Sequence, residues 1–380
     1  MKRILLVTHL NPFGYTFGAE QRTNLVLKSL LSLGNKVDIC YIGQPIECPD
    51  VIMSSSKIVY WNNNTEQNLS KYDCLCRKFL LQMFPESKRF SVIVRELMHK
   101  NDYDCIVCRY VPYAAMAGLG RYADRLLLDI DDLPEQALQI DFSSKHGLKK
   151  VYFDLLRLAY RRDTARWIRQ SRASFLPNKL QAIQYNCTYL PNISIMSNEH
   201  LCLTGNHNIL FVGKMDYGPN VDGVKLFIEN NWQSILNIFP DAVFHIAGKG
   251  LEQNLIEEWT SKFSSIKYWG FVKNLRSFYE IGDIVICPIY SGAGTNIKIV
   301  EAMSMGKVVL VSKNSIKGYE HFLVDGANCL IAENIEDFTY LTTKLFSDSS
   351  LVKHISLTAL AQAKQRYSFD SFKSVLSKFL

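Results

Sequence analysis

Short apolar runs rich in β-branched residues alternate along the chain with longer segments whose apolar positions have helical spacing. Residues 20–33 have the helical pattern, which ends at Gly34, a typical helix stop. Near-continuous apolar strands separated by helices indicate parallel sheets covered by helices on both faces. The predicted strands are residues 2–10, 36–43, 105–110, 125–130, 208–215, 242–248, 265–272, 283–290 and 307–312.

The pattern restarts after Leu203, which divides the chain into two α/β halves. A chain of 380 residues has room for two or three domains of ordinary size. We therefore expect two doubly wound, Rossmann-like domains facing each other across a cleft, the first at residues 1–203 and the second at 204–365. Ligands of such sheets bind at the carboxyl ends of the strands, so candidate chemistry is sought there.

A glycine-rich loop joins one predicted strand of the second half to a helix. Gly292 and Gly294 permit a tight turn, and Thr295 or Asn296 can cap the helix that follows. Free backbone amides at Thr295, Asn296 and Ile297, with the positive end of the helix dipole behind them, predict a diphosphate site.

Two charged residues follow in the same helix. Lys298 lies in the first turn, where the positive end of the helix dipole disfavours a cation. A bound phosphate would explain why a lysine stands there. Glu301 falls on the same helix face and can accept hydrogen bonds from ribose hydroxyls. The alternative interpretation is a glycine-rich turn with a surface Lys–Glu pair.

Other strand ends of the second half carry further candidates. Gly213 and Lys214 end one strand, and Lys214 would point into the cleft unless it is a solvated strand cap. Lys249 lies in a flexible Gly-Lys-Gly loop after the next strand. At the end of the strand at 265–272, the backbone up to Val272 could hydrogen-bond a nucleotide base, with plain strand packing as the alternative. Neither GxxxxGK[ST] nor a GxGxxG after the first strand is present, which disfavours P-loop NTPases and dinucleotide oxidoreductases.

In the first half, one predicted strand ends in Asp129, Asp131 and Asp132. Carboxylates at a strand end are suited to positioning an acceptor hydroxyl or to stabilising positive charge on a sugar. The alternatives are a helix N-cap by Asp132 and a divalent-metal site.

The net charge of +7 is too mild to indicate nucleic acid by itself, and no nucleic-acid recognition module is present. Basic residues and large apolar side chains are interleaved in residues 145–172 and, over a shorter stretch, in residues 77–89. Such helices are typical of anionic membrane surfaces, with a packed helix bearing a solvated basic face as the alternative. No apolar run is long enough to span a membrane. The basic residues of the first stretch are Lys145, Lys149, Lys150, Arg157, Arg161, Arg162, Arg166, Arg169 and Arg172.

Several of these motifs together carry a family resemblance. FVGKMDYGPNVDGVKLF, FPDAVFHIAGKG and YWGFVKNLRSFYEIGDIVICPIYSGAGTNIKIVEAMSMGK resemble, in order and spacing, the C-terminal domain of retaining GT-B glycosyltransferases of the glycosyl transferases group 1 (family 4). The resemblance is strong over residues 208–335 and looser in the first half, through LLVTHLNPFGYTFGAEQRT. It implies that a final helix, at about residues 366–380, crosses back to the first domain.

The resemblance also implies roles for single residues. Lys214 would bind the donor diphosphate, Glu301 the ribose, backbone amides from Gly294 to Ile297 the sugar and phosphates, and Val272 the base. These residues are combined with the candidates identified above from strand ends and loops. The expected catalytic residues are Lys214, Lys298, Glu301 and Asp131. The expected donor-binding residues are Gly213, Lys249, Val272, Gly292, Gly294, Thr295, Asn296 and Ile297. The acceptor and sugar set is Gly18, Glu20, Arg22, Arg109, Tyr110, Asp129 and Asp132.

The chain departs from the family pattern at three places. Ala293 replaces the first glutamate of the paired-glutamate motif, which leaves the identity of the sugar open. A second basic residue is missing at about Asn220 or Gly223, and Lys298 would supply its charge. The histidine expected after the strand at 105–110 is replaced, with Arg109 and Tyr110 as candidates.

The resulting hypothesis is a retaining hexosyltransferase that uses a UDP- or GDP-sugar and a glycan or lipid-linked acceptor. By resemblance its setting is bacterial surface polysaccharide or lipopolysaccharide biosynthesis, in the cytoplasm or on the inner face of the membrane. We expect no cofactor and no essential metal, because lysines and helix amides would neutralise the leaving diphosphate. The alternatives are a nucleotide-sugar epimerase of the same fold and a non-catalytic glycosyltransferase-like binding module.

Overall fold

The computed structural model describes residues 1–14, 18–47, 58–61, 83–135, 148–194, 200–292 and 295–380. The chain divides into two compact units, residues 1–191 with 372–380, and residues 192–371. The last residues are held in unit 1 by aromatic contacts: the Phe372 ring lies 5.7 Å from the Arg22 guanidinium, and Phe379 packs edge-on against Phe175.

Within the described residues, unit 1 is built on a parallel sheet with the strand order β3-β2-β1-β4-β5-β6-β7. Every residue of β4 and β5 is buried, which explains their continuous apolar sequence. The elements of this unit are β1 (Arg3–Thr8), α1 (Gly18–Ser32), β2 (Lys36–Ile42), β3 (Ile58–Trp61), α4 (Lys88–Lys100), β4 (Cys105–Arg109), α5 (Val111–Met116), a 3-10 helix (Leu119–Arg125), β5 (Leu126–Asp129), α7 (Leu148–Gln170), β6 (Ala173–Leu176), α8 (Lys179–Tyr185) and β7 (Thr188–Tyr189).

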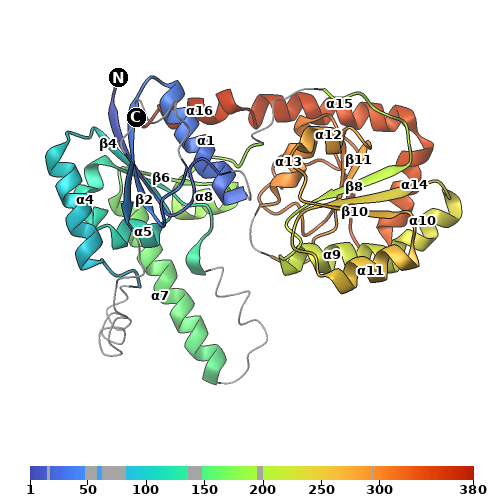
Figure 1. The fold of residues 1–380 in the computed structure, drawn as a ribbon, viewed down its shortest axis with the longest axis horizontal. Coiled ribbons are helices and arrows are strands. Elements are labelled where there is room, and N and C mark those ends of the chain that lie inside the picture. The colour runs from blue at the N-terminus through green and yellow to red at the C-terminus, as the bar shows by residue number, and fades with distance from the viewer. Residues whose placement is uncertain (15–17, 48–57, 62–82, 136–147, 195–199, 293–294) are drawn as a thin grey trace. The chain divides into compact units, whose positions relative to one another are not determined.

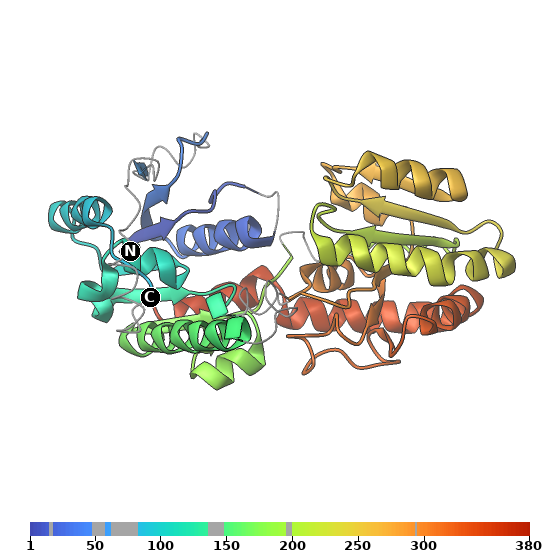
Figure 2. The same cartoon turned by 90° about the horizontal axis from the view of Figure 1, so that it is seen from below.

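Unit 2 has its own parallel sheet, with the order β10-β9-β8-β11-β12-β13 in the described residues. Helices α9 and α11 lie on one face of this sheet and α13 and α15 on the other (Figures 1 and 2). Its elements are β8 (Asn208–Val212), α9 (Gly218–Phe227), a π-helical turn (Ile228–Trp232), α10 (Gln233–Ile238), β9 (Val243–Ala247), α11 (Gln253–Lys262), β10 (Ile266–Gly270), α12 (Leu275–Tyr279), β11 (Ile284–Cys287), α13 (Ile297–Ser304), β12 (Val308–Ser312), β13 (Leu330–Ala332), α14 (Asp337–Ser347) and α15 (Ser349–Arg366); α16 (Phe369–Ser377) follows and leads into unit 1.

The predicted class of fold is confirmed: each unit is a doubly wound α/β domain with parallel strands. In both sheets the chain order reverses around a central strand, which creates a switch point where neighbouring strand ends diverge. In unit 1 these are the ends of β1 and β4, and in unit 2 those of β8 and β11. Sequence patterning missed β3, β6, β7 and β13, which have two to four residues each.

Helix α7 has two different halves. Its C-terminal half packs into unit 1 through Trp167 and Ile168, each 6% exposed. Its N-terminal half extends away from the strands of this unit (Figure 1), and Leu155 is 62% exposed. None of the helices in the described part of the chain is long and apolar enough to cross a membrane.

Candidate functional site

Helix α13 begins beside the carboxyl end of β11, with Asn296 as its N-cap residue. Asn296 thus occupies the predicted cap position, but its side chain makes no capping bond among the described residues. Asn296 instead donates to the Ser315 carbonyl (3.1 Å), and the Thr295 hydroxyl accepts a hydrogen bond from Asn192 (3.0 Å). The first bond ties the start of α13 to the loop that follows β12, and the second ties it to the beginning of unit 2.

The predicted set of three free amides is also incomplete. The amide of Ile297 donates to the Thr295 carbonyl at 3.1 Å, so a tight turn uses this donor internally. Gly292 has a φ of 103°, which requires glycine, and a Cβ there would lie 2.9 Å from the Tyr217 hydroxyl. Gly294 and Ala293 lie outside the described residues.

Lys298 is buried in unit 2 rather than extended into solvent. Its Nζ donates to Oδ1 of Asn220 at 2.8 Å and lies 4.0 Å from the centre of the Phe211 ring. Burial lowers the pKa of Lys298 to about 8, although Cys287 and Glu301 favour its charged form. A cation–π contact and one amide oxygen offset only part of the cost of burying this charge.

Glu301 lies one turn further along α13 and is also buried. Its Oε1 accepts a hydrogen bond from the Tyr279 hydroxyl at 2.7 Å. Burial raises the pKa of Glu301, while Tyr279 and Lys298 act in the opposite direction. The interpretation of residues 298 and 301 as a surface ion pair is therefore wrong, since neither side chain is at the surface.

The close packing around Lys298 requires glycine at two positions. A Cβ at Gly213 would lie 2.7 Å from Nζ of Lys298, and a Cβ at Gly248 would lie 1.7 Å from the Gly213 carbonyl oxygen. Gly248 also has a φ of 144°. The ends of β8 and β9 therefore approach each other over a buried ammonium group, an arrangement that side chains larger than hydrogen would prevent.

The remaining candidates of unit 2 lie at strand ends. Lys214 is exposed, and its Nζ is 3.2 Å from Asp216 Oδ1. Lys249 is exposed in the loop after β9, and its carbonyl accepts from the Met215 amide at 2.8 Å. Val272 follows β10 and is half-buried. All three lie on the carboxyl side of their strands, as predicted.

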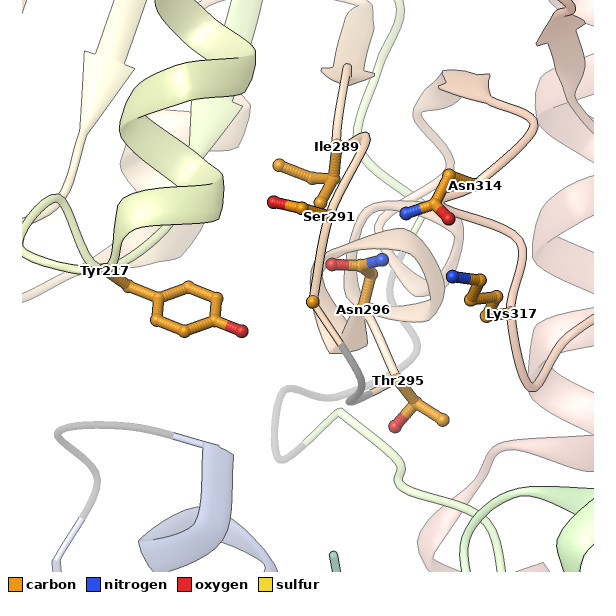
Figure 3. Close-up of a pocket in the computed structure, with 8 residues that line it drawn as sticks. Tyr217, Ile289, Ser291, Thr295, Asn296, Asn314 and Lys317 are labelled. Atoms are coloured by element: carbon orange, nitrogen blue, oxygen red, sulfur yellow. The ribbon is translucent and has the colours of Figure 1, made fainter. Parts of the chain in front are cut away.

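A small pocket of about 80 Å³ lies beside the start of α13 (Figure 3). Tyr217 lies on one side, Asn314 and Lys317 lie on the other, and Asn296 is between them (Figure 3). Among the described lining residues none is acidic, so the pocket offers hydrogen-bond donors and one cation to an oxygen-rich ligand. The described lining residues are Tyr217, Ile289, Ser291, Gly292, Thr295, Asn296, Asn314 and Lys317.

In unit 1 the predicted residues Arg22, Arg109 and Asp129 form a buried cluster. Each is at most 1% exposed. One guanidinium nitrogen of each arginine lies 2.5 Å from a carboxylate oxygen of Asp129. Burial alone would raise the pKa of Asp129, but the two arginines outweigh it and lower the pKa. Because Asp129 is enclosed by these partners, it positions the arginines rather than facing a ligand.

The cluster continues toward the surface through Asp131. Its carboxylate accepts from Arg109 at 3.2 Å and from the Tyr110 hydroxyl at 3.4 Å. Asp132 is exposed, yet its pKa is raised to about 6. The larger cause is the loss of water around the carboxylate, and the second is repulsion from Asp131. Asp131 and Asp132 are thus the carboxylates of this strand end that remain near solvent.

Two further candidates lie in α1. Gly18 is its first residue and Glu20 lies in its first turn. The Glu20 carboxylate packs so closely on Gly14 that a Cβ there would lie 2.6 Å from Oε2.

Within the described ranges, no group of three or more His, Cys, Asp or Glu side chains could hold a metal ion. Two of the three clustered aspartates are instead bound by arginines, as the preceding contacts show. The alternative of a metal site at Asp129, Asp131 and Asp132 therefore has no support in the structure.

Several residues at the two sites were missed by sequence reasoning. Asn220 and Tyr279 hold Lys298 and Glu301, and no local sequence signal identifies them, since each meets its partner from a distant element. Asn314 and Lys317 follow the predicted strand at 307–312. Lys214 was identified because ligands of such sheets bind at the carboxyl ends of strands, and the same reasoning would have identified Asn314 and Lys317.

Part of the chain matches a known protein family. Residues 206–348 match the model of the family glycosyl transferases group 1. A protein of Klebsiella pneumoniae described as an uncharacterized 44.6 kDa protein in the cps region is 23% identical and covers 100% of this chain and 99% of its own length.

Solved structures share the fold at lower identity. Sucrose-phosphate synthase from Thermosynechococcus elongatus aligns with a TM-score of 0.73 at 11% identity, over 100% of this chain and 98% of its own. HepE from Anabaena, in complex with UDP and glucose, aligns with a TM-score of 0.68 at 14% identity, over 100% and 99%. Two Rossmann-like domains with these neighbours define a GT-B fold. Within this fold, residues 206–348 are the part of the chain that matches the family of glycosyl transferases group 1.

Proposed function

We propose that this protein is a retaining hexosyltransferase that moves a sugar from UDP-sugar or GDP-sugar to a glycan or lipid-linked acceptor. We place it in bacterial surface polysaccharide or lipopolysaccharide biosynthesis, at the inner face of the cytoplasmic membrane. The Klebsiella relative from a cps region and the HepE complex with UDP and glucose support this assignment.

The observation that carries the proposal is the pair of buried, oppositely charged residues on α13. Lys298 and Glu301 are held by the polar partners Asn220 and Tyr279 in the core behind the end of β8. Burying two ionisable groups lowers the stability of the folded protein, and such groups are typical of functional sites. In the proposed role, Lys298 stabilises the leaving diphosphate and Glu301 binds the ribose.

A second cation is available at the end of β8. Lys214 and its partner Asp216 are 49% and 46% exposed, so their ion pair is weak and easily exchanged. A diphosphate oxygen can replace the Asp216 carboxylate without a large energetic cost. We propose that Lys214 and Lys298 together offset the charge that develops on the leaving group. The amides of Thr295 and Asn296, Gly292, Lys249 and Val272 complete the proposed donor site, with Val272 near the base.

In unit 1, Asp131 and its neighbours form the proposed acceptor and sugar site. Asp131 is held in place by Arg109 and Tyr110, so its carboxylate is preorganised to offset positive charge on the reacting sugar. Gly18, Glu20 and Asp132 are the proposed lining residues, while Arg22 and Asp129 fix the orientation of Arg109.

Helix α7 supports a position at a membrane surface. Val151, Leu155 and Leu158 are 57%, 62% and 43% exposed and follow one another at helical spacing. Arg162 and Arg169 continue the same face toward the C-terminus of the helix, where both are exposed. An exposed apolar stripe followed by arginines matches the acyl boundary and the anionic headgroups of a lipid leaflet. Lys145 and residues 77–82 lie outside the described residues.

The test is calorimetric binding of UDP, GDP and their sugars, followed by product analysis with purified glycan and lipid acceptors. We expect Glu301→Ala and Lys298→Ala each to weaken nucleotide-sugar binding or turnover at least tenfold. The exposed Lys225→Ala, which removes a surface lysine of the same unit, is the control. Unchanged binding and turnover in both site variants would overturn the assignment. Recovery of an epimerised sugar nucleotide would establish an epimerase instead, and binding without turnover would establish a binding module.

A further inference from the structure

His9 follows β1 directly and lies outside every set of residues assigned above. Its ring stacks on Tyr113, with centroids 3.9 Å apart and an interplanar angle of 13°, and meets the Tyr110 ring edge-on at 5.3 Å. Since β1 and β4 are neighbours, with Val7 opposite Cys108, the residues that follow the two strands lie side by side. His9 therefore belongs to the same strand-end surface as Tyr110.

The imidazole is fixed in place but incompletely hydrogen-bonded. Nδ1 is buried and has no hydrogen-bond partner in the described part of the chain. A buried polar atom without a partner destabilises the folded protein, so its presence calls for an explanation. The stacking on Tyr113 fixes the plane of the ring, so its polar atoms are preorganised.

The backbone beside His9 is strained. Tyr110 has a φ of 67°, a conformation that a bulky aromatic residue rarely adopts and that persists only where the surrounding structure holds it. Its amide is held by the Asp129 carbonyl at 3.0 Å, and its hydroxyl donates to Asp131. In this conformation Tyr110 contacts both groups: its ring meets His9 and its hydroxyl bonds Asp131.

The charge state of His9 restricts what it can bind. Burial, with repulsion from Arg109, lowers the pKa of His9 to about 4. At neutral pH the ring is uncharged and offers one N–H and one lone pair, whichever tautomer is present. An uncharged ring is a poor partner for a phosphate or carboxylate, but it suits a hydroxyl group, which both donates and accepts.

We propose that His9 is a sugar-binding residue, whose imidazole hydrogen-bonds a hydroxyl of a pyranose ring lying over the ends of β1 and β4. The inference rests on the proposed function and adds a residue to its sugar site. Tyr110 and Tyr113 provide aromatic surface beside this position, and Asp131 provides an acceptor for a second hydroxyl. The sugar is either the transferred hexose or the acceptor residue, which share this chemistry.

Two variants of His9 test the proposal. His9→Phe keeps the ring stacked on Tyr113 and removes both nitrogens, whereas His9→Gln restores a hydrogen-bonding group at similar reach. We expect His9→Phe to lower kcat/KM at least tenfold with the melting temperature and the affinity for UDP unchanged, and His9→Gln to recover part of the activity. A raised KM for the nucleotide sugar identifies the donor hexose as the ligand, and a raised KM for the acceptor identifies the acceptor.

The outcomes separate this inference from the proposed function. Full activity of His9→Phe, with normal UDP binding, would overturn the role of His9 and leave the transferase assignment intact. Loss of thermal stability in His9→Phe, without recovery of activity in His9→Gln, would show that the residue serves packing alone. A wild-type protein that binds no nucleotide and transfers no sugar would overturn both.

Discussion

Lys298 donates its hydrogen bond to Asn220, a residue 78 positions earlier in the chain, at 2.8 Å. The two side chains come from α13 and α9, and they meet under the end of β8. Asn220 also donates to the Lys214 carbonyl at 2.8 Å. One amide thus holds the buried lysine and fixes the backbone of the exposed one, so both candidate phosphate ligands depend on the same residue.

The lowered pKa of Lys298 predicts a pH-dependent stability. Between about pH 8 and the ordinary value of 10.5, the unfolded chain holds this proton and the folded protein does not. The free energy of unfolding therefore rises with pH across this window, by at most about 3 kcal/mol, and is flat below it for this group. Lys298→Met should lose this rise in urea denaturation compared at pH 7.5 and 10. The exposed Lys225→Met should keep it, and parallel behaviour of the two variants would contradict the prediction.

Tyr279 is expected to position Glu301 rather than to touch the ligand. Tyr279→Phe removes the 2.7 Å hydrogen bond and leaves the ring in the core. We expect nucleotide affinity to fall about three- to tenfold, less than in Glu301→Ala, because an unconstrained carboxylate still reaches the ribose. Calorimetry with UDP measures both variants. An effect of Tyr279→Phe as large as that of Glu301→Ala would show that Tyr279 itself binds the ligand.

Asp129 should be essential for the stability of unit 1. Asp129→Asn removes the buried counter-charge of Arg22 and leaves Arg109 with Asp131 alone, a change that typically costs about 3–5 kcal/mol. The pKa of Asp129 is lowered in the folded protein, so its contribution is complete above about pH 4 and is lost as the pH falls through the folded value. The difference between wild type and variant should therefore shrink in acid. Asp102→Asn, at an exposed site, is the control, and equal denaturation curves would contradict the prediction.

Gly248 should tolerate no side chain. Its φ of 144° is strained for other residues, and a Cβ would lie 1.7 Å from the Gly213 carbonyl oxygen. We expect Gly248→Ala to destabilise unit 2 by more than about 3 kcal/mol. Gly218→Ala is the matched control, since apart from its chain neighbours and the nearby backbone of its own helix no atom of the described residues lies within 4 Å of the place its Cβ would occupy, and its φ is ordinary. Similar melting temperatures for both variants would show that the β8 and β9 ends can separate without cost.

Neutralising the arginines of α7 should release the protein from anionic lipid. Replacing Arg161, Arg162, Arg166 and Arg169 by alanine removes four charges, each worth about 1 kcal/mol near an anionic leaflet. We expect binding in flotation with phosphatidylglycerol vesicles to fall more than tenfold, and Leu155→Asp to reduce it as well. Alanine at Lys344, Lys353 and Lys364, exposed lysines of unit 2, is the control. Unchanged flotation of the arginine variant would remove the support that α7 gives to a membrane position.

The patterning of the chain determined the α/β class, the parallel strands and the strand ends at which chemistry would lie. These features depend on local signals: continuous apolar runs, helix periodicity and glycines that permit turns. Residues 213, 214, 248 and 249 fall at or just beyond strand ends, and residues 298 and 301 lie in the helix after the glycine-rich loop, as their sequence context predicted. The short strands β3, β6, β7 and β13 were not predicted, because a strand of two to four residues is too short to show a hydrophobic pattern.

Only the tertiary structure decided what the candidate residues face. Helical spacing placed Lys298 and Glu301 on one face, but long-range packing buried both and supplied Asn220 and Tyr279 as partners. The aspartates at the end of β5 were equivalent in sequence, yet Arg22 and Arg109 enclose Asp129 and leave Asp131 and Asp132 nearer solvent. Burial and pairing depend on residues distant in the chain, and for that reason no local pattern encodes them.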